Sequence, residues 1–537
     1  MGKRKRDAVD DHRPSPINGS AKEQKTSAQR IDASANNHIT IQIVVGSYER
    51  VLHGITAEVP QFAVALTDKD SDECITFSDT FLFHAHTSAI RCLALSPPTS
   101  SKDTSAQNQR VLLATGSSDE RINLYHLSAS PPPRNNKAPP IPSLTSNAVT
   151  EDPKNRELGS LIHHSGPVTA LHFPTRSKLL SSAEDSTIAI VRSRDWTVLS
   201  TIKAPIPKAQ GRPSGDTAPP GCVPAGVNDF AVHPSMKLML SVGKGEKCMR
   251  LWNLVIGKKA GVLNFGREIL QGVGEGKWGS GEGRKVVWNQ SGDEFVVGFE
   301  RGAVVFGLDS KPRGRILPSP PTKIHQLRYL STSKAPENPR SNKVELSNVL
   351  AVSTEDGRVI FYTTTPCEAS GLGIDSSEAG IPNCRLLGQL GGRSTGLGGR
   401  IKDFDILEVS YGDLRSGNPE FITVTGSSDG AVRLWRIKVH DILYSLKANG
   451  SPASENQSSS MRVGSENTDA TKPSSPSPRQ IGTLAGVYET GNRITCLRAF
   501  VMVGHADSGG NGGNGGEHPE EEMNYESNNS SDGSDDS

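Results

Sequence analysis

Acidic residues recur at tight turns along this chain, each between two apolar runs, and such residues could act as general acids or bases. Six acids occupy these turns: Asp119, Asp185, Glu246, Glu300, Asp356 and Asp429. A histidine lies ahead of two of them, so His86 with Asp119 and His164 with Asp185 could form acid–base dyads. Catalysis does not need a dyad that repeats along the chain, whereas a repetitive fold does. We therefore interpret the turn acids as fold-holding residues, because a short acid accepts backbone N–H bonds at a turn.

A glycine-rich stretch at 272–283, GVGEGKWGSGEG, invites comparison with a phosphate-binding loop. The spacing excludes that motif, because position 271 is Gln where Gly is required and position 278 is Trp where Ser or Thr is required. We expect a loop between repeats instead. No nucleophile elbow or Cys–His signature is present, so the sequence offers no catalytic constellation and predicts no enzyme.

Cysteine spacing argues against a metal centre and a disulfide framework. The seven cysteines are scattered with no C-x-x-C pair, and we expect no metal and no cofactor. An odd number of cysteines without a signal peptide fits a reducing compartment. No run of 18 apolar residues occurs, so we expect a soluble intracellular protein without membrane or small-molecule partners.

The elements that carry the turn acids are hairpins that recur along the chain. Apolar and polar residues alternate on both sides of each turn, which is the period of a half-buried strand. The hairpins lie at 112–127, 179–191, 239–254, 349–362 and 421–435. A second element, an apolar strand that ends at a His or Gly turn before another strand, lies at 81–95, 158–173, 226–234 and 481–500. Together they give four strands per repeat, which is typical of a WD40 β-propeller.

Counting repeats predicts how the ring closes. Six turn acids mark six blades, and strands are left over at 38–48, 50–59 and 80–86 and again at 493–500. Joined, these strands predict a seventh blade built from both ends of the chain, which removes open sheet edges. The fold class is thus an all-β, seven-bladed propeller. Truncating 490–501 is expected to destabilise the ring as strongly as truncating 39–57.

In WD40 blades the turn Asp commonly contacts the His that precedes the inner strand, so the two dyads are expected as structural pairs. The residues assigned to this structural role are His86, Asp119, His164, Asp185, Trp252, Asp356, Asp429 and Trp435.

The predicted organisation is a propeller between two polar ends. Residues 1–38 and 502–537 are predicted to be disordered, and the propeller spans 39–501. Five inserts interrupt the propeller, at 129–157, 204–224, 271–283, 365–383 and 440–479. Ser-Pro pairs that could be phosphorylated begin at Ser15, Ser451, Ser475 and Ser477.

Charge is balanced overall but uneven along the chain. The net charge of +1 gives no global field that favours nucleic acid or membranes. The first residues include four consecutive cations, Lys3, Arg4, Lys5 and Arg6, which resemble a nuclear localisation signal and could also contact RNA phosphates or remain simply solvated. The stretch 517–537 carries eight acids and no Lys or Arg.

Several blocks resemble one particular family of WD40 proteins. LSVGKGEKCMRLWNLVIGKKAGVLNF at 240–265 is similar to the signature blade of the ribosome-assembly family that includes p21-activated-kinase-interacting protein. Supporting blocks occur in the family's order at 43–55, 83–96, 163–173 and 491–500. The resemblance implies a nuclear, nucleolar factor for assembly of the large (60S) ribosomal subunit, with pre-60S proteins and possibly pre-rRNA as partners. Some relatives also bind and restrain a p21-activated kinase.

Two departures from the family stand out. Gly245-Glu246 replaces a single turn Asp, which predicts a turn longer by one residue, and the acidic tail replaces a Lys-rich one. Alternatives to ribosome assembly are a cytoplasmic adaptor that negatively regulates a p21-activated kinase, and a ubiquitin-ligase substrate receptor. The receptor is disfavoured because the W-D-x-R motif is absent after Trp252 and Trp435.

Overall fold

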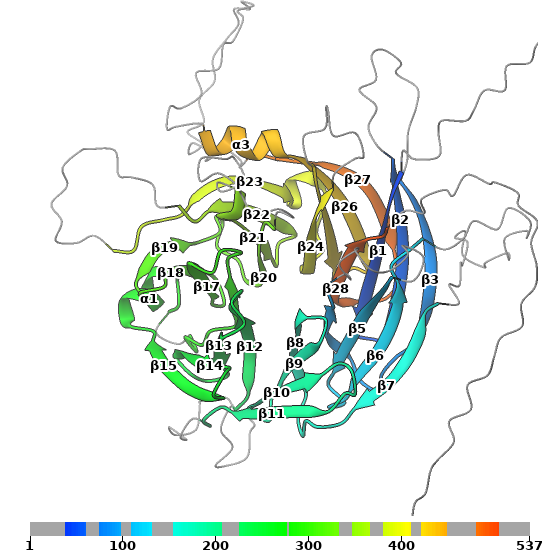
Figure 1. Ribbon diagram of the computed structural model, residues 1–537. Helices are drawn as coiled ribbons and strands as arrows, with labels where there is room; N and C mark the ends of the chain where they lie inside the picture. Colours follow the sequence, from blue (N-terminus) through cyan, green and yellow to red (C-terminus); the bar gives the residue numbers. More distant parts are fainter. Residues whose placement is uncertain are drawn as a thin grey trace, which may run out of the picture.

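A computed structural model describes residues 38–60, 75–97, 109–131, 154–206, 225–276, 279–331, 346–365, 380–409, 420–447 and 479–503. Seven antiparallel sheets of four strands each are arranged in a ring (Figure 1). This arrangement confirms the predicted seven-bladed propeller.

We number the blades by the order of their inner strands along the chain. Blade 1 contains β4 (Ile90–Leu95), β5 (Arg110–Ser117), β6 (Ile122–Ser128) and β7 (Arg156–Leu161). Blade 2 contains β8 (Val168–Thr175), β9 (Lys178–Ala183), β10 (Thr187–Arg192) and β11 (Val198–Lys203). Blade 3 contains β12 (Val227–Val232), β13 (Leu238–Gly243), β14 (Cys248–Asn253) and β15 (Lys258–Asn264). Blade 4 contains β16 (Lys285–Trp288), β17 (Glu294–Gly298), β18 (Ala303–Gly307) and β19 (Pro312–Ile316).

The remaining blades complete the ring. Blade 5 contains β20 (Ile324–Tyr329), β21 (Val349–Thr354), β22 (Arg358–Thr363) and β23 (Arg385–Gly391). Blade 6 contains β24 (Ile401–Val409), β25 (Glu420–Ser427), β26 (Ala431–Lys438) and β27 (Thr483–Glu489). Blade 7 contains β28 (Ile494–Val501) from one end of the chain with β1 (His38–Ser47), β2 (Val51–Pro60) and β3 (Thr76–His84) from the other.

The strands form because both faces of a blade are covered by its neighbours. On β1, Ile41 and Ile43 pack with residues of blade 6 such as Val424, whereas Val44 packs with Leu113 of blade 1. Successive side chains of a strand point to opposite faces, so the middle strands are buried on both sides and the hydrophobic core is divided among the blade interfaces.

The two chain ends meet inside blade 7, as predicted. β28 and β1 run antiparallel, with Ile41 opposite Val501 and Val45 opposite Leu497. A bulge at Gly46–Ser47 ends the regular register. The next contact is a hydrogen bond from the Tyr48 N–H to the Arg493 carbonyl, at 2.8 Å. Backbone hydrogen bonds therefore close the ring.

Deleting residues 490–501 should open the ring and lower its melting temperature by as much as deleting 39–57. Either deletion removes part of blade 7 and exposes the apolar faces of blades 1 and 6. Calorimetry and size-exclusion chromatography would measure the change, with deletion of 504–537 as the control. A ring that melts at the same temperature without 490–501 would contradict closure by β28.

Several predicted boundaries need correction. β7 begins at Arg156, inside the insert predicted over 129–157, whereas β1 begins at His38, where the strand predicted over 38–48 starts. At the other end, Met502 donates its N–H to the Thr40 carbonyl at 2.8 Å and Val503 donates to the Ala129 carbonyl at 2.7 Å. Backbone pairing continues past the last apolar alternation that the sequence shows.

Two helices were not predicted. The insert predicted over 440–479 starts with helix α3 (Val439–Lys447), which lies outside β23 and β26 (Figure 1). Ile442 is fully buried in the core shared by blades 5 and 6, and Arg385 donates to the Leu446 carbonyl at the end of the helix. A shorter helix, α1 (Arg267–Gly272), opens the glycine-rich stretch. Neither helix, and no other in the described residues, is long and apolar enough to cross a membrane.

Candidate functional site

Two blades contain the histidine–acid pairs that the sequence singled out. In blade 1 His86 Nδ1 lies 3.1 Å from an Asp119 carboxylate oxygen, and its Nε2 lies 2.8 Å from the Thr115 hydroxyl. In blade 2 His164 makes the same contacts with Asp185, at 3.1 Å, and with the Ser181 hydroxyl, at 2.8 Å. The imidazole of each blade therefore joins the turn acid to a hydroxyl of the second strand.

The electrostatics of the blade 1 pair favour a neutral histidine beside an ionised acid. Burial lowers the pKa of His86 and outweighs the attraction of Asp119. Burial alone would raise the pKa of Asp119, but hydrogen bonds from the Thr87 and Arg121 N–H groups, together with His86, lower it. The side chains of both partners are nearly inaccessible to solvent, at 0% and 7% exposed. We infer that the pairs fasten turns, since no substrate could reach them.

Blades 3 and 6 use a tryptophan at the corresponding hydroxyl. Trp252 Nε1–H donates to the Ser241 hydroxyl at 2.8 Å, and Trp435 Nε1–H donates to the Thr425 hydroxyl at 3.3 Å. Both indoles are buried, at 4% and 5% exposed. The second-strand hydroxyl is therefore contacted by a histidine in blades 1 and 2 and by a tryptophan in blades 3 and 6.

The other turn acids pair with arginines. Asp429 lies 3.0 Å from Arg433, and Asp356 lies 2.6 Å from Arg358. In blade 3 Glu246 contacts Arg250. The last strand pair before the turn is Val242 with Met249 in this blade and Gly116 with Ile122 in blade 1, so the blade 3 turn is one residue longer. The longer turn expected from Gly245-Glu246 is therefore present.

The central channel gathers polar residues from the inner strand of every blade. A cavity of about 450 Å³ is lined by residues of β4, β8, β12, β16, β20, β24 and β28. The sequence analysis missed this site, because its residues lie far apart along the chain. The only signal is that polar residues interrupt the apolar pattern of the inner strands.

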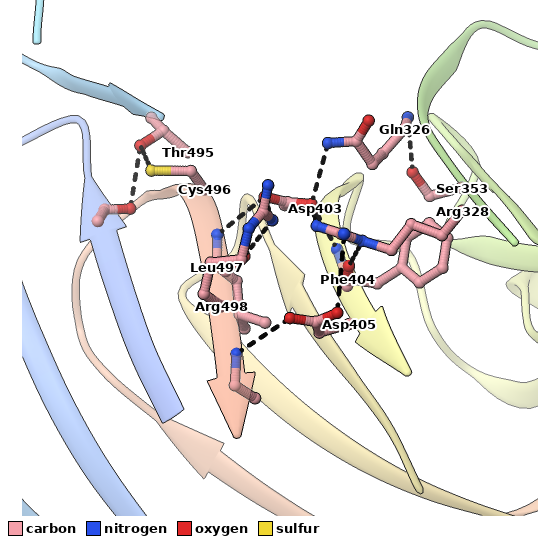
Figure 2. A network of polar contacts seen from close by, with 12 residues as sticks. Gln326, Arg328, Ser353, Asp403, Phe404, Asp405, Thr495, Cys496, Leu497 and Arg498 are labelled. Carbon is pink, nitrogen blue, oxygen red and sulfur yellow. Dashed lines mark hydrogen bonds and ion pairs between the residues drawn. The ribbon is translucent and has the colours of Figure 1, made fainter. Parts of the chain in front are cut away.

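Asp403 is the centre of the channel network (Figure 2). Its carboxylate accepts hydrogen bonds from Arg498 at 2.9 Å, from the Leu497 N–H at 3.1 Å and from Gln326 at 3.2 Å. Arg328 lies 3.4 Å away and also donates to the Phe404 carbonyl at 2.5 Å. The network therefore connects blades 5, 6 and 7 beside the ring closure.

Charges in this network compensate one another. Burial would raise the pKa of Asp403, but Arg498 and Arg328 outweigh it and lower the pKa, so the carboxylate is ionised. Asp405 completes the set by accepting the Ala499 N–H at 3.2 Å and by lying 3.7 Å from Arg328. A carboxylate with all its partners in place stabilises the structure and is not available as a catalytic base.

Replacing Asp403 by Asn should destabilise the protein by about 3 kcal/mol, because two largely buried arginines lose their shared counter-charge. Urea unfolding would measure the loss. The control is Glu355→Gln, which breaks a more exposed pair with Arg400 and should change stability by less than about 1 kcal/mol. Equal losses in the two variants would show that Asp403 carries no special weight.

Buried histidines should make stability depend on pH. Burial, then Lys402, lowers the pKa of His325 to about 4, and burial, then His164, lowers that of His163 to about 4. Both are neutral at pH 7 in either state. As the pH falls below 6.5, the unfolded chain binds protons that the folded chain refuses until about pH 4, so the free energy of unfolding decreases over this window.

Replacing His325 by Gln should make this decrease shallower between pH 6.5 and 4, as measured by thermal melts at several pH values. The charged groups that act on His325 are Lys402, Arg400 and Arg284 with the acid Glu355, and the substitution leaves all four in place. His440→Gln is the control, because the His440 side chain is 76% exposed. Identical slopes in wild type and His325→Gln would contradict the assignment.

One apolar tip projects from the blade with the family-specific block. Val255 and Ile256, at the turn between β14 and β15, are 72% and 62% exposed. The turn is well fixed, because Asn253 Oδ1 accepts both of their N–H groups and Gly257 takes a positive φ of 66°. These two adjacent aliphatic side chains form a small apolar patch that is exposed to solvent.

The other features predicted from the sequence form no site among the described residues. Lys3, Arg4, Lys5 and Arg6 and the four Ser-Pro pairs lie outside the described residues. The glycine-rich stretch covers the turn of blade 4, since Glu275 accepts the Glu300 N–H at 3.1 Å. Across the described ranges no three His, Cys, Asp or Glu side chains are grouped as a metal site requires, and Cys92, Cys248, Cys384 and Cys496 are free thiols.

Comparison with known proteins gives consistent matches. The repeat family described as WD domain, G-beta repeat matches residues 77–126 and 155–191. A p21-activated protein kinase-interacting protein 1-like of Danio rerio is 28% identical over 50% of this chain and 51% of its own length. The Xenopus laevis protein of that name is 24% identical over 75% of this chain and 76% of its own length.

A yeast relative extends the comparison. Protein MAK11 of Saccharomyces cerevisiae is 27% identical over 73% of this chain and 77% of its own length. The fold is typical of scaffolds, and none of these names denotes an enzyme. The chain contains WD40 repeats and is similar to the p21-activated protein kinase-interacting proteins and to Protein MAK11.

Proposed function

We propose that this protein is a non-enzymatic scaffold in nucleolar assembly of the large ribosomal subunit and in pre-rRNA processing. The block at 240–265 supports the proposal, because it resembles the signature blade of the ribosome-assembly family. That block folds into blade 3, and its turn between β14 and β15 presents the exposed pair Val255 and Ile256. The mechanism is rigid display: the blades fix the loops, and the loops present side chains to several partners at once.

The observation that carries the proposal is this exposed tip. Exposed aliphatic side chains reduce solubility unless a partner covers them, and the surrounding turn is too well bonded to retract them. We infer that the tip contacts a protein of the pre-60S particle. The polar interior of the channel and the turn acids contribute stability to the ring instead.

The tagged protein should sediment with pre-60S particles, and its depletion should lower 60S levels and impair pre-rRNA processing. Replacing both Val255 and Ile256 by Asp should shift the protein to free fractions without changing its melting temperature. The control is Leu308→Asp, a 60% exposed side chain between β18 and β19 of blade 4. Sedimentation only as free protein, with normal 60S levels after depletion, would refute the proposal.

Relatives' names favour a second candidate, an adaptor that binds and restrains a p21-activated kinase. Several relatives are named as interacting with such a kinase, and a fission yeast relative is named Shk1 kinase-binding protein 15. Localisation separates the two functions: a full-length tagged protein already in the cytoplasm favours the adaptor, whereas loss of nuclear signal on removing residues 1–12 favours the nuclear role.

A further inference from the structure

A second hollow lies on the face of the ring opposite the turn acids, between blades 1 and 2. Its volume is about 480 Å³, and its lining includes His126, Arg176, Arg194 and Trp196. Arg110 and Arg156 lie beside it: Arg176 donates to the Arg110 carbonyl, and Arg156, which also lines a neighbouring pocket, pairs with His126 across β6 and β7. We call these six residues the basic hollow.

The positive charge of the basic hollow is not compensated. Among the described residues, Arg110, Arg156 and Arg194 take part in no ion pair. Asp195 lies nearby, but it is engaged by Arg192 at 3.0 Å and by the hydroxyl of Thr197 at 2.8 Å. Burial lowers the pKa of His126, and the nearby charges of Arg110, Arg176 and Arg156 lower it further.

This hollow differs from the channel, where every arginine of the Asp403 network has an acid. Like charges held together without counter-charges repel one another, so an anion that enters gains energy from several groups at once. Guanidinium groups present paired N–H donors that match the oxygens of phosphate. The basic hollow therefore suits a polyanion that is longer than one phosphate group.

Trp196 indicates which polyanion fits. Its indole is partly exposed at the wall of the hollow, and its backbone has a φ of 57°, which is rare for an aromatic residue. Asp195 holds this turn by accepting the Thr197 N–H at 3.2 Å. An aromatic ring beside arginines is the arrangement that stacks an unpaired base while cations bind the backbone. A duplex, whose bases are already stacked, would leave Trp196 unused.

We propose that the basic hollow binds single-stranded RNA, with the arginines on the phosphates and a base against Trp196. This inference rests on the proposed role in ribosome assembly, where single-stranded RNA is present. The basic hollow is the surface that would contact this RNA. The competing occupant is the acidic segment 504–537 of the same chain. Val503 donates to the Ala129 carbonyl, and Ala129 in turn donates to the carbonyl of Gln109, next to Arg110, so Val503, the last residue described, lies near the hollow.

The test measures binding of a short labelled single-stranded RNA to the full-length chain by fluorescence anisotropy at several salt concentrations. Replacing both Arg156 and Arg194 by Gln should weaken binding at least about tenfold and reduce the salt slope by about 1.4, since each phosphate contact contributes about 0.7. The matched control replaces Lys258 and Lys259 of β15 by Gln, because these exposed lysines remove the same charge from another blade.

Three results would overturn the proposal. The first is an equal loss of RNA affinity in both double variants, and the second is equal affinity for single-stranded and duplex RNA. The third is that a 504–537 peptide binds the wild type more tightly than the RNA does and no longer binds the Arg156/Arg194 variant. If that variant fails to fold, Arg110→Gln with Arg194→Gln replaces it. Sedimentation separates this inference from the proposed function, since a wild type that binds no RNA but still enters pre-60S particles refutes only the basic hollow.

Discussion

Pairing between β28 and β1 is the interaction on which the ring depends. Each blade packs against two neighbours, so a gap at any interface exposes apolar side chains on both sides of it. Blade 7 is the single blade whose strands come from the two ends of the chain. The other six blades fold from continuous segments, but their mutual packing is complete only when the two ends meet.

The polar channel reinforces this closure. Asp403 joins Arg498 of β28 to Arg328 of β20, and thereby connects the closing strand to two preceding blades. Thr495 adds a hydrogen bond to the Ile90 carbonyl of blade 1, at 2.6 Å. Breaking a buried ionic network leaves an uncompensated charge and costs much stability, so the intact network holds the closing strand in place.

Local sequence patterns predicted the blades, whereas contacts between residues far apart in the sequence could not be predicted. Turn acids such as Asp119 and the alternation around them revealed the blades, because hairpins are encoded within a few residues. Helix α3 was missed because a Ser- and Pro-rich insert masked apolar residues at helical spacing, Val439, Ile442, Leu443 and Leu446. The Asp403 network and the basic hollow could not be predicted, since strand register and blade order bring their residues together.

The hydrogen bond from Met502 to Thr40 places the two ends of the described chain side by side on one face of the ring. A short linker from Val503 to His38 would therefore join them without strain, and new ends could be opened in a loop between other blades. Such a circular permutant would keep every blade interface. The blade that the two chain ends share is then set by the order of the strands in the sequence, and the packing of the ring does not require it to be blade 7.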